Sequence, residues 1–133
     1  MTTGSLHLSV RIDRPVSAVY AFASDLANLP LWAPGLGSAV VHQDGSWFVD
    51  TSAGRARIEM APANPFGVLD HDVTTPTGET VHVPMRAIVY DDGCEVVFTL
   101  RRSPGMTDDE LARDTALVVA DLARLKEIVE ARG

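Results

Sequence analysis

The stretch from residue 40 to residue 101 alternates apolar and polar residues between short turn signals, and this pattern constrains the fold more than any other feature. Period-two alternation is typical of strands with one buried face. Turn residues at short intervals join such strands as consecutive hairpins. We take the turns to be Asp44-Gly45, Ala53-Gly54, Pro76-Thr77-Gly78 and Asp92-Gly93. The segment is therefore predicted to be an antiparallel meander of about six strands.

Each turn also predicts a register, because a slip of one residue would move every side chain of a strand to the other face. The predicted cross-strand partners are Val40 with Val49 and His42 with Trp47; Val49 with Ile58 and Asp50 with Arg57; His71 with Val83, Val73 with Val81 and Asp72 with His82; and Met85 with Leu100, Ala87 with Phe98 and Val89 with Val96. Each turn is chosen independently, and the registers that follow from the turns place most apolar residues on one face. Agreement of this kind between turn chemistry and patterning supports the prediction.

Two short helices are predicted between an N-terminal strand and the meander. The strand alternates Leu, Leu, Val and Ile with polar residues over positions 6–12. Pro15 ends this strand and suits the first turn of a helix, while Asp25 can cap a second helix that Pro30 limits. The order at this end is strand, helix, helix.

One long amphipathic helix is predicted after the meander. Thr107 to Glu110 forms a capping box, in which the Thr and Glu side chains each bond the backbone of the other. An apolar stripe then recurs at spacings of three and four: Leu111, Thr115, Val118, Leu122, Leu125 and Val129. About 24 residues at ~1.5 Å each make a rod of roughly 36 Å, long enough to cross a small sheet.

This order of elements, together with the opening of the chain, resembles the START-like, polyketide cyclase/dehydrase superfamily (SRPBCC). The residues that carry the resemblance are those from Val10 to Phe22 and from Ser24 to Trp32, with an aromatic residue before a Trp. The resemblance implies an α+β fold called the helix-grip, in which a curved antiparallel sheet of about seven strands wraps around the C-terminal helix. It implies one domain over residues 1–133 and an apolar cavity between sheet and helix. The superfamily includes cyclases, lipid carriers and receptors, so the fold does not imply one function.

Composition excludes several function classes. Eighteen acidic residues against eleven basic ones give a net charge of −7, which argues against binding to phosphate backbones or anionic membranes. The single cysteine, Cys94, excludes an intramolecular disulfide and a multi-cysteine metal site. We found no nucleotide-binding glycine motif and no metal-ligand spacing among the four histidines. We expect no cofactor and no metal, and a cytoplasmic protein without a secretory signal or membrane span.

His71 is the only ionisable residue that the central strands contribute to the apolar face of the predicted meander. An imidazole on such a wall could orient a ligand's hydroxyl or carbonyl group, or act as a general base near neutral pH. The alternative is a structural histidine that bonds a neighbour inside a packed core. Partial burial is expected to lower its pKa and favour the neutral form. Asp70 is adjacent in sequence but points to the opposite face of a strand, so a dyad between the two is not expected.

Two small-molecule functions remain open at this stage, beside binding of a partner through an exposed edge of the sheet. The first is binding of a hydrophobic small molecule, such as a lipid, polyketide or aromatic metabolite, between the sheet and the last helix. The second is a cyclase or dehydratase in which His71 is the general acid or base. Neither nucleic acid nor membrane insertion is expected, and the chain would be a monomer or a homodimer. The predicted ligand-binding residues are Trp32, Trp47, Leu69, His71, Val83, Met85, Phe98, Thr115, Val118 and Leu122. For the two tryptophans, packing in the core is the alternative role.

Overall fold

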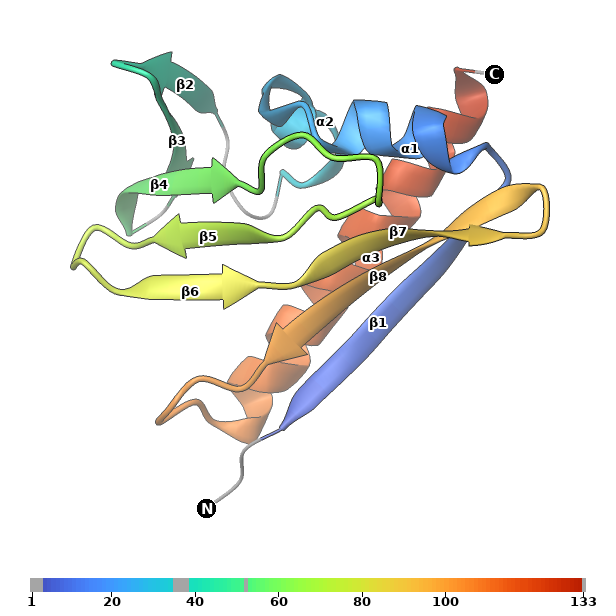
Figure 1. The fold of residues 1–133 in the computed structure, drawn as a ribbon. Helices are drawn as coiled ribbons and strands as arrows, with labels where there is room; N and C mark the ends of the chain where they lie inside the picture. The colour runs from blue at the N-terminus through green and yellow to red at the C-terminus, as the bar shows by residue number, and fades with distance from the viewer. Residues whose placement is uncertain (1–3, 35–38, 52, 133) are drawn as a thin grey trace.

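The computed structural model describes residues 4–34, 39–51 and 53–132 of the 133-residue chain (Figure 1). The described residues form eight strands, three α-helices and one 3-10 helix. In chain order these are β1 (Ser5–Ile12), α1 (Val16–Ala23), the 3-10 helix η1 (Leu26–Asn28), α2 (Leu29–Trp32), β2 (Val40–Gln43), β3 (Ser46–Thr51), β4 (Gly54–Met60), β5 (His71–Thr74), β6 (Thr80–Val83), β7 (Met85–Tyr90), β8 (Gly93–Arg101) and α3 (Asp108–Ala131). The predicted order of strand, short helices, meander and long helix is confirmed.

The strands form two antiparallel sheets, in the orders β1-β8-β7 and β2-β3-β4-β5-β6. About seven strands were expected, and the additional one arises at Pro84, which interrupts the single strand expected between the Pro76-Thr77-Gly78 and Asp92-Gly93 turns. Proline has no backbone N–H to donate to a ladder. The Pro84 carbonyl still accepts the Thr99 N–H at 2.9 Å, so the two sheets meet along this line. Figure 1 shows them turned relative to each other around α3.

Two of the four predicted registers are confirmed. The Asp44-Gly45 turn, with both residues at positive φ, places Val40 opposite Val49 and His42 opposite Trp47. The turn around Gly78 places His71 opposite Val83 and Asp72 opposite His82. The alternation of faces that puts His71 on the inner side of the sheet is therefore correct.

The other two registers are wrong by two residues. In the β3–β4 hairpin Val49 lies opposite Ala56 rather than Ile58, and Asp50 pairs with Arg55, whose Nε lies 2.8 Å from Oδ1. In the β7–β8 hairpin Ala87 lies opposite Val96 rather than Phe98. Because side chains repeat every two residues, a shift of two keeps each strand's apolar face inward.

Gly93 explains the error in the β7–β8 hairpin. The sequence places it in the turn, but the left-handed residue is Asp91 at φ 53°, and Gly93 pairs with Tyr90 at the start of β8. A Cβ atom on Gly93 would lie 2.7 Å from the Ile12 carbonyl oxygen. The glycine therefore allows β1 to approach β8, and does not form the turn.

Helix α3 packs most tightly through its C-terminal half. Its capping box forms as predicted, with Thr107 Oγ1 accepting from Glu110 N–H at 3.1 Å and Glu110 Oε1 accepting from Thr107 N–H at 2.9 Å. The side chains of Leu122, Leu125 and Val129 are buried. In the N-terminal half, by contrast, Leu117 and Val119 are about half exposed. The helix therefore lies close to the core at one end and leaves room beneath it at the other.

No helix among the described residues is long and apolar enough to cross a membrane. Helix α3 has the length, but its polar face carries charges along the whole element.

Candidate ligand-binding cavity

A cavity of about 280 Å³ lies between the N-terminal half of α3, the short helices and the inner face of the sheet. Most of its wall is apolar. The residues that line it are Ala23, Leu26, Leu29, Trp32, Ala33, Ile58, Met60, His71, Val73, Val83, Met85, Phe98, Leu100, Asp114, Leu117, Val118, Asp121 and Leu122. These residues come from the helices at one end, from β4 to β8 beneath, and from α3 above.

The structure brings most of the predicted ligand-binding residues to this one cavity. Those that line it are Trp32, His71, Val83, Met85, Phe98, Val118 and Leu122. Three others do not line it. Leu69 is fully buried in the core, and the hydroxyl of Thr115 donates to the Leu111 carbonyl at 2.8 Å within α3. Trp47 stacks on His42 with ring centroids 4.5 Å apart and lines a separate, more polar hollow beside α1.

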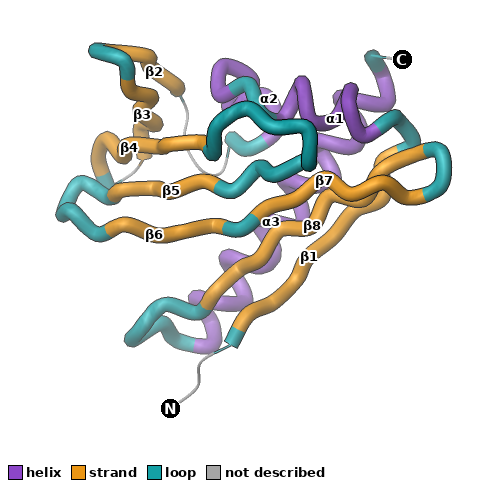
Figure 2. Tube along the Cα trace, viewed as in Figure 1, coloured by secondary structure: helices purple, strands orange, loops and turns teal. Residues whose placement is uncertain are grey.

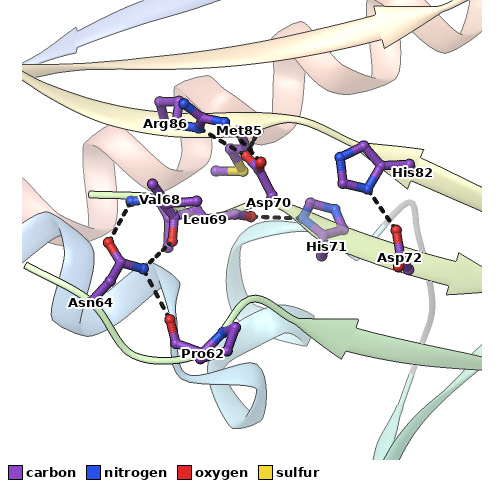
Figure 3. Close-up of polar contacts among 10 residues, drawn as sticks. All are labelled: Pro62, Asn64, Val68, Leu69, Asp70, His71, Asp72, His82, Met85 and Arg86. Carbon is purple, nitrogen blue, oxygen red and sulfur yellow. Dashed lines mark hydrogen bonds and ion pairs between the residues drawn. The ribbon is translucent and has the colours of Figure 1, made fainter. Parts of the chain in front are cut away.

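His71 is 9% exposed, and a backbone contact determines its tautomer (Figure 3). Its Nδ1 lies 3.0 Å from the carbonyl oxygen of Leu69. A carbonyl oxygen only accepts, so Nδ1 carries the proton and Nε2 of the neutral ring presents a lone pair. Burial lowers the pKa of the imidazole, and the bond to Leu69 opposes this effect only in part. The neutral form is therefore favoured, as the sequence predicted.

The carbonyl of Leu69 is positioned by the segment that joins β4 to β5. Asn64 organises this segment: its side-chain oxygen accepts from the Val68 N–H, and its amide nitrogen donates to the carbonyls of Pro62 and Val68 (Figure 3). The same oxygen also accepts from the Phe66 N–H. The Asn64 N–H donates to the Tyr20 hydroxyl of α1 at 3.0 Å. Figure 2 shows the segment as a loop running beside α1. It therefore enters β5 in a defined conformation.

The acidic residues that flank His71 in sequence face the other way. Asp70 bonds Arg86 through two nitrogens at 2.8 and 2.9 Å and accepts the Met85 N–H. The bonds from Arg86 are the main cause that lowers the pKa of Asp70. Asp72 accepts from His82 at 2.7 Å across the sheet (Figure 3). No dyad forms between Asp70 and His71, as the alternation of faces predicted.

The sequence reasoning missed two carboxylates of the cavity wall, Asp114 and Asp121, both on α3. The side chain of Asp121 is only 16% exposed, and burial raises its pKa, while Arg124 at 3.2 Å opposes the rise. The sequence does contain a pattern that could have identified these two residues as part of the cavity wall. They lie seven positions apart, each immediately before a member of the apolar stripe, on the flank of the buried face.

Trp32 lines the cavity from α2 and is 5% exposed, so it has both of the roles the sequence allowed. Its carbonyl accepts from Arg124 Nη1 at 3.2 Å, which connects α2 to α3. Its indole Nε1 is buried and finds no hydrogen-bond partner in the described part of the chain. An unpaired buried donor is costly, by about 1–3 kcal/mol.

Comparison with solved structures identifies the architecture. No family model matches the sequence, and no curated protein matches it. Among solved structures, the Zhui aromatase/cyclase from a Streptomyces species superimposes with a TM-score of 0.68 at 19% identity, covering 98% of this chain and 96% of that one. The chain has the helix-grip fold.

Other helix-grip proteins are similar over the same length. The solution structure of the Aha1 dimer from Colwellia psychrerythraea gives a TM-score of 0.73 at 13% identity and covers 96% of both chains. DynU16, a protein of the dynemicin biosynthetic locus, gives 0.70 at 21% identity. The match to DynU16 covers 95% of this chain but 47% of that one, so this chain spans about half its length. At these identities the likeness shows the fold alone.

Proposed function

We propose that this helix-grip protein binds a hydrophobic small molecule in the cavity beneath α3. The observation that carries the proposal is the cavity itself: about 280 Å³ of space, with a largely apolar wall and one buried imidazole. Concave, mostly apolar sites with a few placed polar groups are where small molecules bind. The similar solved structures include an aromatase/cyclase and a protein of a biosynthetic locus, which supports a small-molecule role.

Apolar burial supplies enough free energy for such binding. A ligand the size of an aromatic side chain buries about 150–250 Å² of surface. At ~25 cal/mol per Å² this burial contributes roughly 4–6 kcal/mol before entropic costs. Because the entropic costs of association reduce this gain, dissociation constants of about 0.1 mM or weaker are expected for an apolar probe.

The test compares two neighbouring valines of α3. Val118 lines the cavity, whereas Val119 faces solvent and is 51% exposed. Naphthalene, added to the wild-type protein and followed by its fluorescence, is expected to bind at a single site. Val118→Trp fills the cavity and is expected to abolish binding, while Val119→Trp leaves it unchanged. Equal binding by all three proteins would place the probe elsewhere and contradict the proposal.

Catalysis of the cyclase or dehydratase type is the second candidate, and one observation favours it. A dehydration needs one group to take a proton and another to give one. Besides His71, the cavity wall contains Asp121, a carboxyl group whose pKa is raised by burial. The test is turnover of a β-hydroxyketone of polyketide type. Activity that disappears in folded His71→Phe supports this candidate, and unchanged activity removes His71 from the mechanism.

A further inference from the structure

We infer that the occupant of the cavity is a small, uncharged ring compound whose hydroxyl group donates a hydrogen bond to Nε2 of His71. This inference rests on the proposed binding function and narrows the class of ligand. Three observations carry it: the size of the cavity, the tautomer of His71, and the charges on the wall.

The volume limits the occupant to a compact molecule. Pockets for drug-sized ligands measure about 300–1,000 Å³, and this cavity of about 280 Å³ falls just below that range. Two long acyl chains or a many-ringed polyketide would not fit within this volume. A molecule of one or two fused rings would fit in this volume.

The tautomer of His71 selects the polar group of the ligand. Nδ1–H is already engaged with the Leu69 carbonyl, so the neutral ring offers only an acceptor at Nε2. No group among the described residues bonds Nε2. A ligand hydroxyl can donate to this nitrogen, whereas a ligand carbonyl would bring two acceptors together. The two possibilities that the sequence left open are thereby reduced to the hydroxyl.

The charges on the wall argue against an anionic occupant. Asp114 and Asp121 line the cavity, and no lysine or arginine does so among the described residues. A carboxylate or phosphate in this space would have two acidic side chains nearby, and the arginine at the end of the cavity, Arg124, is already bonded to Asp121 and to the Trp32 carbonyl. A cationic occupant is disfavoured by the apolar wall, and Asp121 is already paired with Arg124.

The experiment measures dissociation constants for four probes near neutral pH: naphthalene, 2-naphthol, 2-naphthoate and 1-naphthylmethylamine. The proteins are the wild type, His71→Phe, His71→Gln and His82→Phe. His82 lies on the outer face, so its variant is the matched control. Phe removes the acceptor and keeps an aromatic ring, while Gln restores a side-chain acceptor.

The expected result is that wild type and His82→Phe bind 2-naphthol about tenfold more tightly than naphthalene, the gain of one buried hydrogen bond. His71→Phe is expected to bind both probes equally and as tightly as the wild type binds naphthalene, and His71→Gln to recover part of the preference. Naphthoate and the ammonium probe are expected to bind at least tenfold more weakly than naphthol.

Three results would overturn the inference. They are a naphthol preference that persists in His71→Phe, tighter binding of naphthoate, and tighter binding of the ammonium probe. Each would leave the proposed function standing, because naphthalene would still bind. Failure of naphthalene to bind the wild-type protein at all would instead contradict the proposed function and, with it, this inference.

Discussion

His71 shows how a single backbone contact determines the chemistry of a buried side chain. The Leu69 carbonyl, two residues earlier in the chain, holds the proton on Nδ1 and leaves Nε2 as an acceptor. Burial lowers the pKa of the ring, so the folded protein takes up the second proton, on Nε2, at a lower pH than the unfolded chain does.

The lowered pKa predicts a loss of stability in mild acid. Below about pH 6.5 the unfolded histidine binds a proton that the folded one does not. The free energy of unfolding should therefore fall as pH drops through this value, and the contribution should be fully present above it. Urea unfolding at about pH 7.5 and about pH 5.5 measures the effect. His71→Phe should show a smaller difference between the two pH values than the wild type. An equal difference would mean that the ring is protonated inside the fold.

Gly67 and Gly78 offer a second prediction at the scale of single residues. Both have positive φ, 72° and 97°, so alanine is strained at either position. Only at Gly67 would the added Cβ meet the backbone, 2.1 Å from the Ala87 carbonyl oxygen, whereas at Gly78 the space is open. Gly78→Ala is expected to cost about 1 kcal/mol of unfolding free energy. Gly67→Ala should cost more, by about a further 1–3 kcal/mol. Equal losses in chemical denaturation would show that the β4–β5 segment moves freely away from β7.

At the scale of the element, α3 combines a strong local start with uneven tertiary packing. Its capping box forms between residues three apart and needs no other part of the chain. Its burial, in contrast, depends on which part of the sheet lies beneath. The C-terminal half covers the core, and the N-terminal half covers the cavity.

Two threonines of this region provide a matched test of the cap. Thr107→Ala removes the side chain that accepts from the Glu110 N–H and should cost about 1 kcal/mol of unfolding free energy. Thr115→Ala removes a hydroxyl that bonds within the helix, at Leu111, and should cost much less because alanine favours helix. Thermal unfolding of both variants measures the difference. A larger loss at Thr115 would indicate that its hydroxyl has a role outside the helix.

At the scale of the whole molecule, the helices and the two sheets enclose a space that no element encloses alone. Pro84 allows the sheet to turn around α3, and Arg124 connects α3 to α2 at the end of the cavity. The protein is therefore expected to gain stability when the space is filled, because a ligand that binds only the folded state shifts the unfolding equilibrium.

The gain in stability on ligand binding can be measured with 2-naphthol as the probe. At ten times its dissociation constant the ligand should raise the free energy of unfolding by about 1.4 kcal/mol. Amide exchange should slow mainly in the N-terminal half of α3, which covers the cavity. Val118→Trp, with the cavity filled, should show neither change. Slower exchange confined to β1 or to the outer face of the sheet would place the ligand outside the cavity.

The sequence predicted correctly which face of the sheet the hairpin side chains lie on, but two of the four predicted registers were wrong. The Asp44-Gly45 and Gly78 turns were predicted correctly because these positive-φ glycines lie in the turns themselves, whereas Gly54 and Gly93 are the first residues of strands. The β3–β4 and β7–β8 hairpins were misplaced by two residues, since alternation cannot distinguish a shift of two from none. At Gly93 the glycine reflects the proximity of β1, a contact from a distant part of the chain.

The sequence by itself determined the order of elements, the capped terminal helix and the face on which His71 lies. These follow from alternation, turn chemistry and capping, which act between residues close in the chain. Only the tertiary structure decided that Leu69 belongs to the core while Met85 and Phe98 line a cavity, that Asp114 and Asp121 join them, and that His71 presents an acceptor. The physical reason is that the distance between α3 and the sheet at each point depends on the packing of all elements together.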